Sequence, residues 1–226
     1  MATLGEYLGA GSGTTLALYH LENTTDSSGN GRTLTNNNSV AFNAAKFSNG
    51  ADFGASGNTK SLSIGSALGY SANITMSCWV KLNTEITSSY YVFLNLDHLT
   101  TRVAFRMYYD YNSGTRRLYF GRTKLGVADN LVLYNQTLGT TNWNHFLMTY
   151  DGSNCRVYMN GNLFGTVASS GNGTFTSFTD NFSIGNTKTT YQNGHIIDEV
   201  IVENRAWSAS EIKKYYTFAR GRFGII

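Results

Sequence analysis

Two aspartates with unlike surroundings are the sharpest candidates for chemistry in this chain. Asp26 opens the loop DSSGNGR, whose glycines let backbone carbonyls turn inward. Asp198 lies among apolar residues in the stretch IIDEV, where a carboxylate must be paired, hydrogen-bonded or bound to metal, because an uncompensated buried charge is costly. Calcium takes about six to eight oxygen ligands and mixes carboxylates with carbonyls. Each aspartate is therefore a candidate calcium ligand. The alternative is that Asp26 is a plain turn former and Asp198 caps backbone amides.

A second acidic pair, Glu199 and Glu203, is a weaker candidate for catalysis. Strand alternation over residues 195–203 puts Val200 and Val202 on one side and Glu199, Ile201 and Glu203 on the other. Retaining glycoside hydrolysis needs two carboxyl groups about 5 to 5.5 Å apart whose pKa values are separated by their surroundings. Ile201 stands between the glutamates and supplies no such tuning. We therefore interpret them as the polar face of a strand and expect no enzyme.

Tyrosines in the middle of the chain are the candidate ligand-binding residues. Tyr90, Tyr91, Tyr108 and Tyr109 form adjacent pairs, and Arg106 lies beside them. In a strand, adjacent side chains point to opposite faces, so one ring of each pair must leave the core. Tyrosine rings stack on sugars while their hydroxyls form hydrogen bonds, so these five residues are a candidate glycan site. The alternative is an ordinary sheet with one buried and one solvent-facing ring at each pair.

Local sequence patterns predict the strands and the helix that surround these residues. Residues 195–203 predict a long strand, and Ser208 with Glu211 forms a capping box before a helix whose apolar stripe continues to Ala219. About thirteen short β-strands separated by Gly, Asn, Asp and Ser turns precede this helix, as an all-β sandwich requires. The ranges expected to form strands include 16–21, 40–42, 51–53, 61–64, 74–82, 90–96, 103–109, 116–122, 127–135, 145–150, 156–159, 163–167 and 182–185. Residues 169–179 are expected to form an exposed loop.

Four stretches resemble a known family in the same order along the chain. They are LALYHL with DSSGNGR, ITMSCWVK, NWNHFLMTYDG with VYMNG, and IDEVIVENRAWSASEI. They resemble LamG-like (laminin G-like or pentraxin-like) jelly rolls of the concanavalin A-like lectin/glucanase superfamily. The resemblance implies a two-sheet antiparallel β-sandwich with one short C-terminal helix. It also implies that Asp26 and Asp198 lie together and hold a structural calcium with loop carbonyls near Asn30. Glucanases of this superfamily carry Glu, Asp and Glu at alternate positions of one strand, and here Ile201 replaces the Asp.

Length, composition and net charge restrict the kinds of partner and segment that this chain can have. The chain has 226 residues, only 14% charged residues, a net charge of +3 and no proline. This charge is too small to favour nucleic acid as a partner, and no apolar run is long enough for a membrane span. Cys78 and Cys155 are either bridged or, as residue burial habits favour, two buried thiols. The start MATLGEYLGAGSGTT lacks the basic and apolar regions of a signal peptide.

These observations give one domain at residues 14–218, a flexible arm at 1–13 and a tail at 219–226. We expect a non-enzymatic recognition or adhesion module that binds a glycan or a protein surface outside the cell. The alternative is a structural component of a virion or another surface assembly, with homo-oligomers formed through the two ends of the chain. An active or inactive β-glucanase-like hydrolase ranks third.

Overall fold

The computed structural model describes residues 13–54, 59–65, 68–69, 73–97, 104–124, 127–168, 181–185 and 193–221. The arm up to residue 12, the loop expected at 169–179 and the tail beyond residue 221 lie outside these ranges. Among the described residues, no helix combines the length and apolar character that crossing a lipid bilayer requires.

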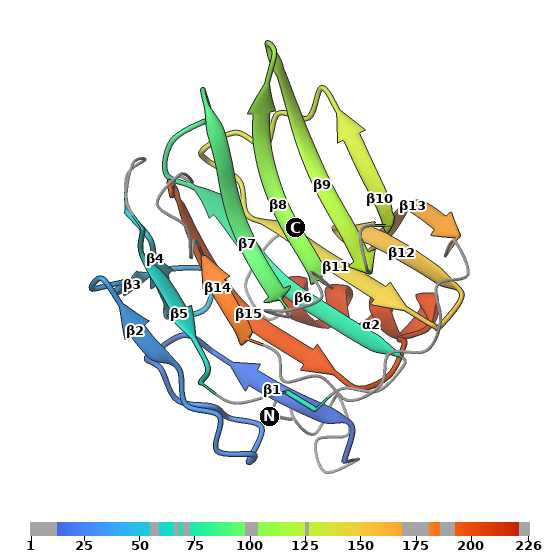
Figure 1. Cartoon of the computed structure of the whole chain (residues 1–226). Coiled ribbons are helices and arrows are strands. Elements are labelled where there is room, and N and C mark those ends of the chain that lie inside the picture. The colour runs from blue at the N-terminus through green and yellow to red at the C-terminus, as the bar shows by residue number, and fades with distance from the viewer. Residues whose placement is uncertain are drawn as a thin grey trace.

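Two antiparallel sheets pack face to face, as Figure 1 shows, so the predicted β-sandwich is confirmed. Sheet A has eight strands, in the order β13 (Asn162–Ala168), β12 (Asn154–Met159), β11 (Asn144–Tyr150), β6 (Ile74–Leu82), β15 (His195–Glu203), β4 (Asn49–Asp52) and β3 (Ala41–Ala44), with β1 (Thr15–Tyr19) also pairing with β15. Sheet B has seven, in the order β10 (Val127–Tyr134), β9 (Thr115–Lys124), β8 (Ala104–Asn112), β7 (Ser89–Asp97), β14 (Asn181–Gly185), β5 (Ser61–Ser63) and β2 (Thr35–Asn37). The short strand β2 has no counterpart among the strands expected from the sequence.

The main core lies between the sheets and is rich in aromatic rings. Phe93 of β7 stacks on Phe146 of β11, with ring centroids 5.5 Å apart, and so joins sheet B to sheet A. Cys78 and Cys155 are free, buried thiols on β6 and β12, which flank β11, so the expectation of two unbridged cysteines is confirmed. Rings packed offset or edge to face contribute beyond the area they bury. The sandwich is therefore held by side chains from both sheets.

Strand β15 runs through the middle of sheet A, and all nine of its residues are buried. The register with β6 shifts between Asp198 and Ile201, and Glu199 takes the left-handed backbone conformation with φ of 49°. Such a bulge inserts an extra residue and re-aims side chains. The interpretation of Glu199 and Glu203 as a solvent-facing polar row is wrong, because they are only 8% and 0% exposed.

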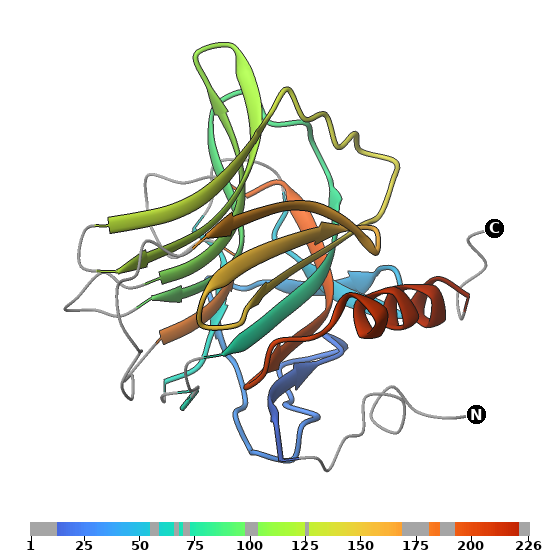
Figure 2. The same cartoon turned by 90° about the vertical axis from the view of Figure 1, so that its right-hand side faces the viewer.

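Helix α2 (Ala209–Gly221) covers the outer face of sheet A (Figure 2). Its Ile212 and Tyr215 pack with Ile201 of β15 and Leu147 of β11 in a second apolar cluster. The helix continues to Gly221, beyond residue 218 where we expected the domain to end, and Ala219 is buried against Phe47 and Trp79. The start of the predicted tail therefore belongs to the domain.

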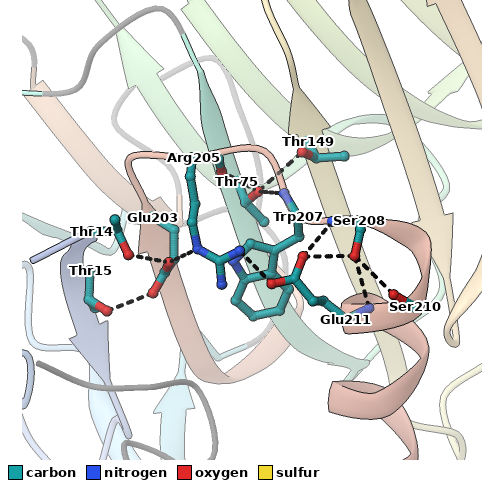
Figure 3. Close-up of polar contacts among 10 residues, drawn as sticks. All are labelled: Thr14, Thr15, Thr75, Thr149, Glu203, Arg205, Trp207, Ser208, Ser210 and Glu211. Atoms are coloured by element: carbon teal, nitrogen blue, oxygen red, sulfur yellow. Dashed lines mark hydrogen bonds and ion pairs between the residues drawn. The ribbon is translucent and has the colours of Figure 1, made fainter. Parts of the chain in front are cut away.

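A chain of ionic hydrogen bonds ties β15 to the start of this helix (Figure 3). Glu203, which is fully buried, accepts from Thr15 Oγ1 at 2.6 Å, Thr14 Oγ1 at 3.1 Å and Arg205 Nε at 3.0 Å. Arg205 also donates to Glu211 Oε1 at 2.6 Å. Glu211 Oε2 accepts from the Ser208 amide at 2.7 Å, and the Glu211 amide donates to Ser208 Oγ at 3.3 Å. The predicted capping box is confirmed.

We expect Ser208→Ala to lower the free energy of unfolding by about 1 kcal/mol, because the amide of Glu211 loses its side-chain acceptor. Chemical denaturation monitored by circular dichroism measures this change. Ser208→Thr keeps a hydroxyl at the cap and should lose much less. Equal midpoints for wild type and Ser208→Ala would contradict the role of this cap.

Candidate functional site

The outer face of strands β7, β8 and β9 gathers the polar aromatic side chains of the candidate glycan site. Phe105, Met107 and Tyr109 of β8 point into the core, so the alternate residues Arg106, Tyr108 and Asp110 point outward. Leu118 and Phe120 of β9 likewise point inward. We call the outward-facing set the tyrosine face; its members are Tyr90, Val92, Asn95, Arg106, Tyr108, Asp110, Arg117, Tyr119 and Gly121.

Strand register arranges the tyrosine face in rows across the strands. The middle row is Val92, Tyr108 and Tyr119, which are partners in successive strand pairs. On one side lies the row of Asn95, Arg106 and Gly121, and on the other the row of Tyr90, Asp110 and Arg117. A register shift in β7 between Val92 and Leu94 keeps these rows aligned, because Phe93 is the extra residue. Without that bulge the outward residues of β7 would be out of phase.

Three tyrosine rings form the centre of this face. Tyr108 and Tyr119 stack with ring centroids 4.3 Å apart and an interplanar angle of 12°. Tyr90 meets Tyr108 edge to face, at 5.4 Å. Burial raises the pKa of the Tyr108 phenol, and the nearby Tyr119 and Asp110 add to that rise. The Tyr108 phenol therefore stays protonated at physiological pH and can donate a hydrogen bond.

Charged groups on either side of the rings are held by hydrogen bonds. Arg117 binds Asp110 with two hydrogen bonds, Nε to Oδ1 at 2.8 Å and Nη2 to Oδ2 at 2.6 Å. Asp110 is only 1% exposed, so its charge is compensated within the sheet. On the opposite row, Arg106 donates from Nε to Asn95 Oδ1 at 3.0 Å. Both guanidinium groups are thus fixed in place beside the stacked rings.

The structure divides the five predicted ligand-binding residues. Tyr90, Tyr108 and Arg106 lie together on the tyrosine face. Tyr91 and Tyr109 point into the core and are 1% and 0% exposed, so a ligand on this face cannot touch them. This corrects their assignment to the site and bears out the expectation that each adjacent pair is split between the faces.

The sequence analysis did not assign some residues of this face to the candidate site. Asp110 alternates with Arg106 and Tyr108, and that period of two was a usable signal. Asn95 and Gly121 join the site only through the pairing of β7, β8 and β9, which the sequence does not state.

Asp26 is surrounded by donors from its own neighbourhood. Its carboxylate accepts from the amides of Ser28 (2.9 Å), Arg32 (2.9 Å) and Leu18 (3.2 Å), and from the Ser28 hydroxyl (2.8 Å). Burial alone would raise the pKa of Asp26, but these hydrogen bonds hold it below its ordinary value. Asn30 donates through Nδ2 to the carbonyl of Thr15 at 2.8 Å. These contacts close the loop onto β1.

Asp198 uses its two oxygens for two other amides. Oδ2 accepts from the Phe47 amide and Oδ1 from the Glu199 amide, both at 2.8 Å. Burial and the neighbouring Glu199 carboxylate raise the pKa of Asp198 to about 8, against the effect of these hydrogen bonds. Asp26 and Asp198 share none of the partners described here. Within the described ranges, no group of three or more His, Cys, Asp or Glu side chains is arranged to hold a metal ion.

Calcium binding by Asp26, Asn30 and Asp198 stays a prediction. A calcium ion shared by the aspartates should raise the melting temperature by a few degrees at millimolar concentration, since a ligand of the folded state stabilises it by mass action. Differential scanning fluorimetry with calcium and with a chelator measures this, with Asp26→Asn and Asp198→Asn as the variants that should lose the response. Identical melting curves for wild type in calcium and chelator would rule the site out.

The raised pKa of Asp198 predicts a pH dependence of stability. Its pKa rises from an ordinary 3.8 to about 8 in the folded chain, so folding takes up a proton between these values. Stability from this group is therefore complete below about pH 4 and is lost as the pH rises through about 8. Urea denaturation between pH 5 and 9 should show a steeper loss in wild type than in Asp198→Asn. Parallel pH profiles would contradict the assignment.

Comparison with known proteins agrees with this architecture. The family described as the concanavalin A-like lectin/glucanases superfamily (Laminin_G_3) matches residues 53–213. A search of curated proteins finds no match to this chain.

Solved structures with a similar fold include the botulinum neurotoxin serotype D binding domain (TM-score 0.71, 15% identity, 91% of this chain and 51% of that one). The serotype G binding domain is also similar (TM-score 0.69, 17% identity, 90% and 51%). The chain thus spans about half the length of these binding domains.

Domain 4 of AbnA, a GH43 extracellular arabinanase from Geobacillus stearothermophilus, was solved in complex with arabinotriose (TM-score 0.62, 17% identity, 90% of this chain and 98% of that one). At these identities the likeness concerns the fold, and together with the sequence match it shows that this chain belongs to the laminin G branch of the concanavalin A-like lectin/glucanase superfamily.

Proposed function

We propose that this chain is a non-catalytic recognition module that binds a glycan on its tyrosine face. The observation that carries the proposal is the stacked pair of Tyr108 and Tyr119, met edge-on by Tyr90, on the outer side of sheet B. The rings are partly exposed, and burial raises the pKa of the Tyr108 and Tyr119 phenols, so these two remain protonated donors. Such rings offer an apolar platform for a sugar ring with hydroxyl groups beside it.

The strand setting suits a binding surface. Tyr108 and Tyr119 are direct partners in the pairing of β8 with β9, and the stacking of their rings restricts both side chains. A pre-ordered side chain loses little conformational entropy when a ligand binds, so more of the contact energy appears as affinity. Tyrosine has few rotatable bonds for its contact area, which adds to this advantage.

The names of similar structures support recognition as the class of function. The neurotoxin relatives are binding domains, and the arabinanase domain is one that was solved with a bound oligosaccharide. These likenesses also favour action outside the cell, since the arabinanase is an extracellular enzyme.

A hydrolase remains the rival because the superfamily includes glucanases. The surroundings of Glu199 and Glu203 argue against that reading. Glu203 is fully buried and accepts three hydrogen bonds from Thr14, Thr15 and Arg205. Glu199 is 8% exposed, and its Oε1 lies 2.9 Å from His20 Nδ1. A carboxyl group that works on a glycosidic bond must reach the substrate, and these two are enclosed by protein.

The test is binding to an oligosaccharide array that includes arabinotriose, followed by calorimetry with the best ligand. We expect Tyr108→Ala to weaken binding about tenfold or more, because truncating an aromatic anchor at an interface typically costs over ~1 kcal/mol. Tyr111→Ala is the matched control: Tyr111 lies in the same strand and packs against the core side. Equal affinities for wild type and Tyr108→Ala, or no glycan bound at all, would overturn the proposal.

A further inference from the structure

The close stacking of Tyr108 and Tyr119 determines how both rings are oriented on sheet B. These residues are partners on the neighbouring strands β8 and β9, and such strands lie about 4.8 Å apart. Their ring centroids are 4.3 Å apart, and the ring planes differ by only 12°. Two rings that lay flat on the sheet, side by side, would clash at that distance. Both rings therefore stand upright, with their faces directed from strand to strand.

The two rings differ in what lies on either side of them. Tyr108 has Tyr119 on its β9 side, and Tyr90 of β7 meets it edge to face at 5.4 Å. Tyr119 has Tyr108 on its β8 side, and the described contacts of Tyr119 include no other aromatic ring. Tyr108 thus lies between two rings, whereas one face of Tyr119 is not stacked on another aromatic side chain.

The second face of Tyr119 is directed toward β10, the strand at the edge of sheet B (Figure 1). Tyr119 is partly exposed, so a ligand on the outer side of the sheet can reach the ring. A sugar ring placed against this face would stand upright beside Tyr119, above β10, with its C–H groups on the phenol ring. It would not lie flat across both tyrosines.

Tyr108 has a supporting part in this arrangement. Its ring packs along one face of Tyr119 and so restricts the rotation of that side chain, which lowers the entropy lost when a ligand binds. Burial raises the pKa of the Tyr108 phenol, and the electrostatic effect of Tyr119 adds to that rise, which agrees with two hydroxyls that lie near each other. The pair therefore combines one accessible apolar face with two neighbouring hydroxyl groups.

We propose that Tyr119 is the residue on which a sugar ring stacks, and that Tyr108 is a positioning residue that acts through Tyr119. This inference rests on the proposed glycan-binding function and assigns separate roles within its aromatic pair. The saccharide class is a neutral sugar with C–H groups on one ring face, because the face of a phenol ring offers apolar contact and no ionised partner. The competing arrangement is a flat platform in which both tyrosines touch the sugar directly.

A double-mutant cycle measured by calorimetry separates these two arrangements. The probes are arabinotriose and the neutral oligosaccharide that binds most tightly on the array. Tyr119→Ala should weaken binding about tenfold or more, as the loss of an aromatic anchor does. Tyr108→Ala should also weaken binding, because the Tyr119 ring loses its support. In a Tyr119→Ala background, however, Tyr108→Ala should change Kd by less than about twofold, since it has nothing left to position.

A conservative variant and a spectroscopic signature test the positioning role further. Tyr108→Phe keeps a ring against Tyr119 and should bind within about threefold of wild type, because only one neutral hydroxyl is lost. In NMR spectra at saturating probe, the ring current of Tyr119 should move the stacked sugar C–H protons upfield. This shift should persist in Tyr108→Phe and disappear in Tyr119→Leu.

Tyr216→Ala is the matched control, because Tyr216 is a partly exposed tyrosine that stacks on Trp79, at 5.7 Å, on the helix side of sheet A. It should leave all affinities unchanged. Melting temperatures check the fold of each variant, and Leu replaces Ala in the cycle where an Ala variant does not fold. Additive losses in the double variant, or an upfield shift that persists in Tyr119→Leu, would overturn the assignment while keeping the glycan site. Binding confined to charged saccharides would overturn the saccharide class, and no binding of any saccharide by the wild type would overturn the proposed function itself.

Discussion

The central constraint on this fold is that β15 is buried along its whole length, although it carries three carboxylates. All nine residues are buried, so Asp198, Glu199 and Glu203 must each find partners inside the protein. Glu203 does this with hydroxyls from the start of β1 and with Arg205. Arg205 then holds Glu211, which completes the cap of α2. Burying one carboxylate therefore fixes the first strand, the turn after the last strand, and the helix.

The sequence predicted most of this architecture because its patterns are local. Alternation, turn residues and the capping box each involve residues close together in the chain, and the two antiparallel sheets match the expected sandwich. The prediction failed where tertiary contacts decide. Glu199 and Glu203 look like the polar side of an amphipathic strand, yet a helix and β1 cover that side. The helix also runs past the expected domain end, because Ala219 finds a buried place against Phe47 and Trp79.

The candidate site likewise could be predicted only in the features that depend on neighbouring residues in the sequence, and not in those that depend on contacts between distant strands. Adjacent tyrosines were enough to predict that one ring of each pair faces outward, which strand geometry requires. The bulge at Phe93 sets the phase of Tyr90 relative to Asn95 within β7, and the residues that become neighbours depend on the register of β7, β8 and β9. Patterns within a single sequence do not determine which residues pair across neighbouring strands. Asn95 and Gly121 therefore could not be assigned to the row of Arg106 before the strands were placed beside one another.

The outer faces of the two sheets differ in how accessible they are to a ligand. On sheet A, α2 fills the space above the central strands. The burial of His145 shows that this face is closed to a ligand there. Its side chain is fully buried between Trp79 and Tyr215, at centroid distances of 5.1 and 5.3 Å, and burial lowers the pKa of its imidazole to about 3. On sheet B, by contrast, four outer residues of β8 and β9 remain partly exposed and polar, namely Arg106, Tyr108, Arg117 and Tyr119. The same sandwich thus uses one sheet to satisfy its own buried charges and leaves ordered aromatic rings on the other, so recognition is best sought on sheet B.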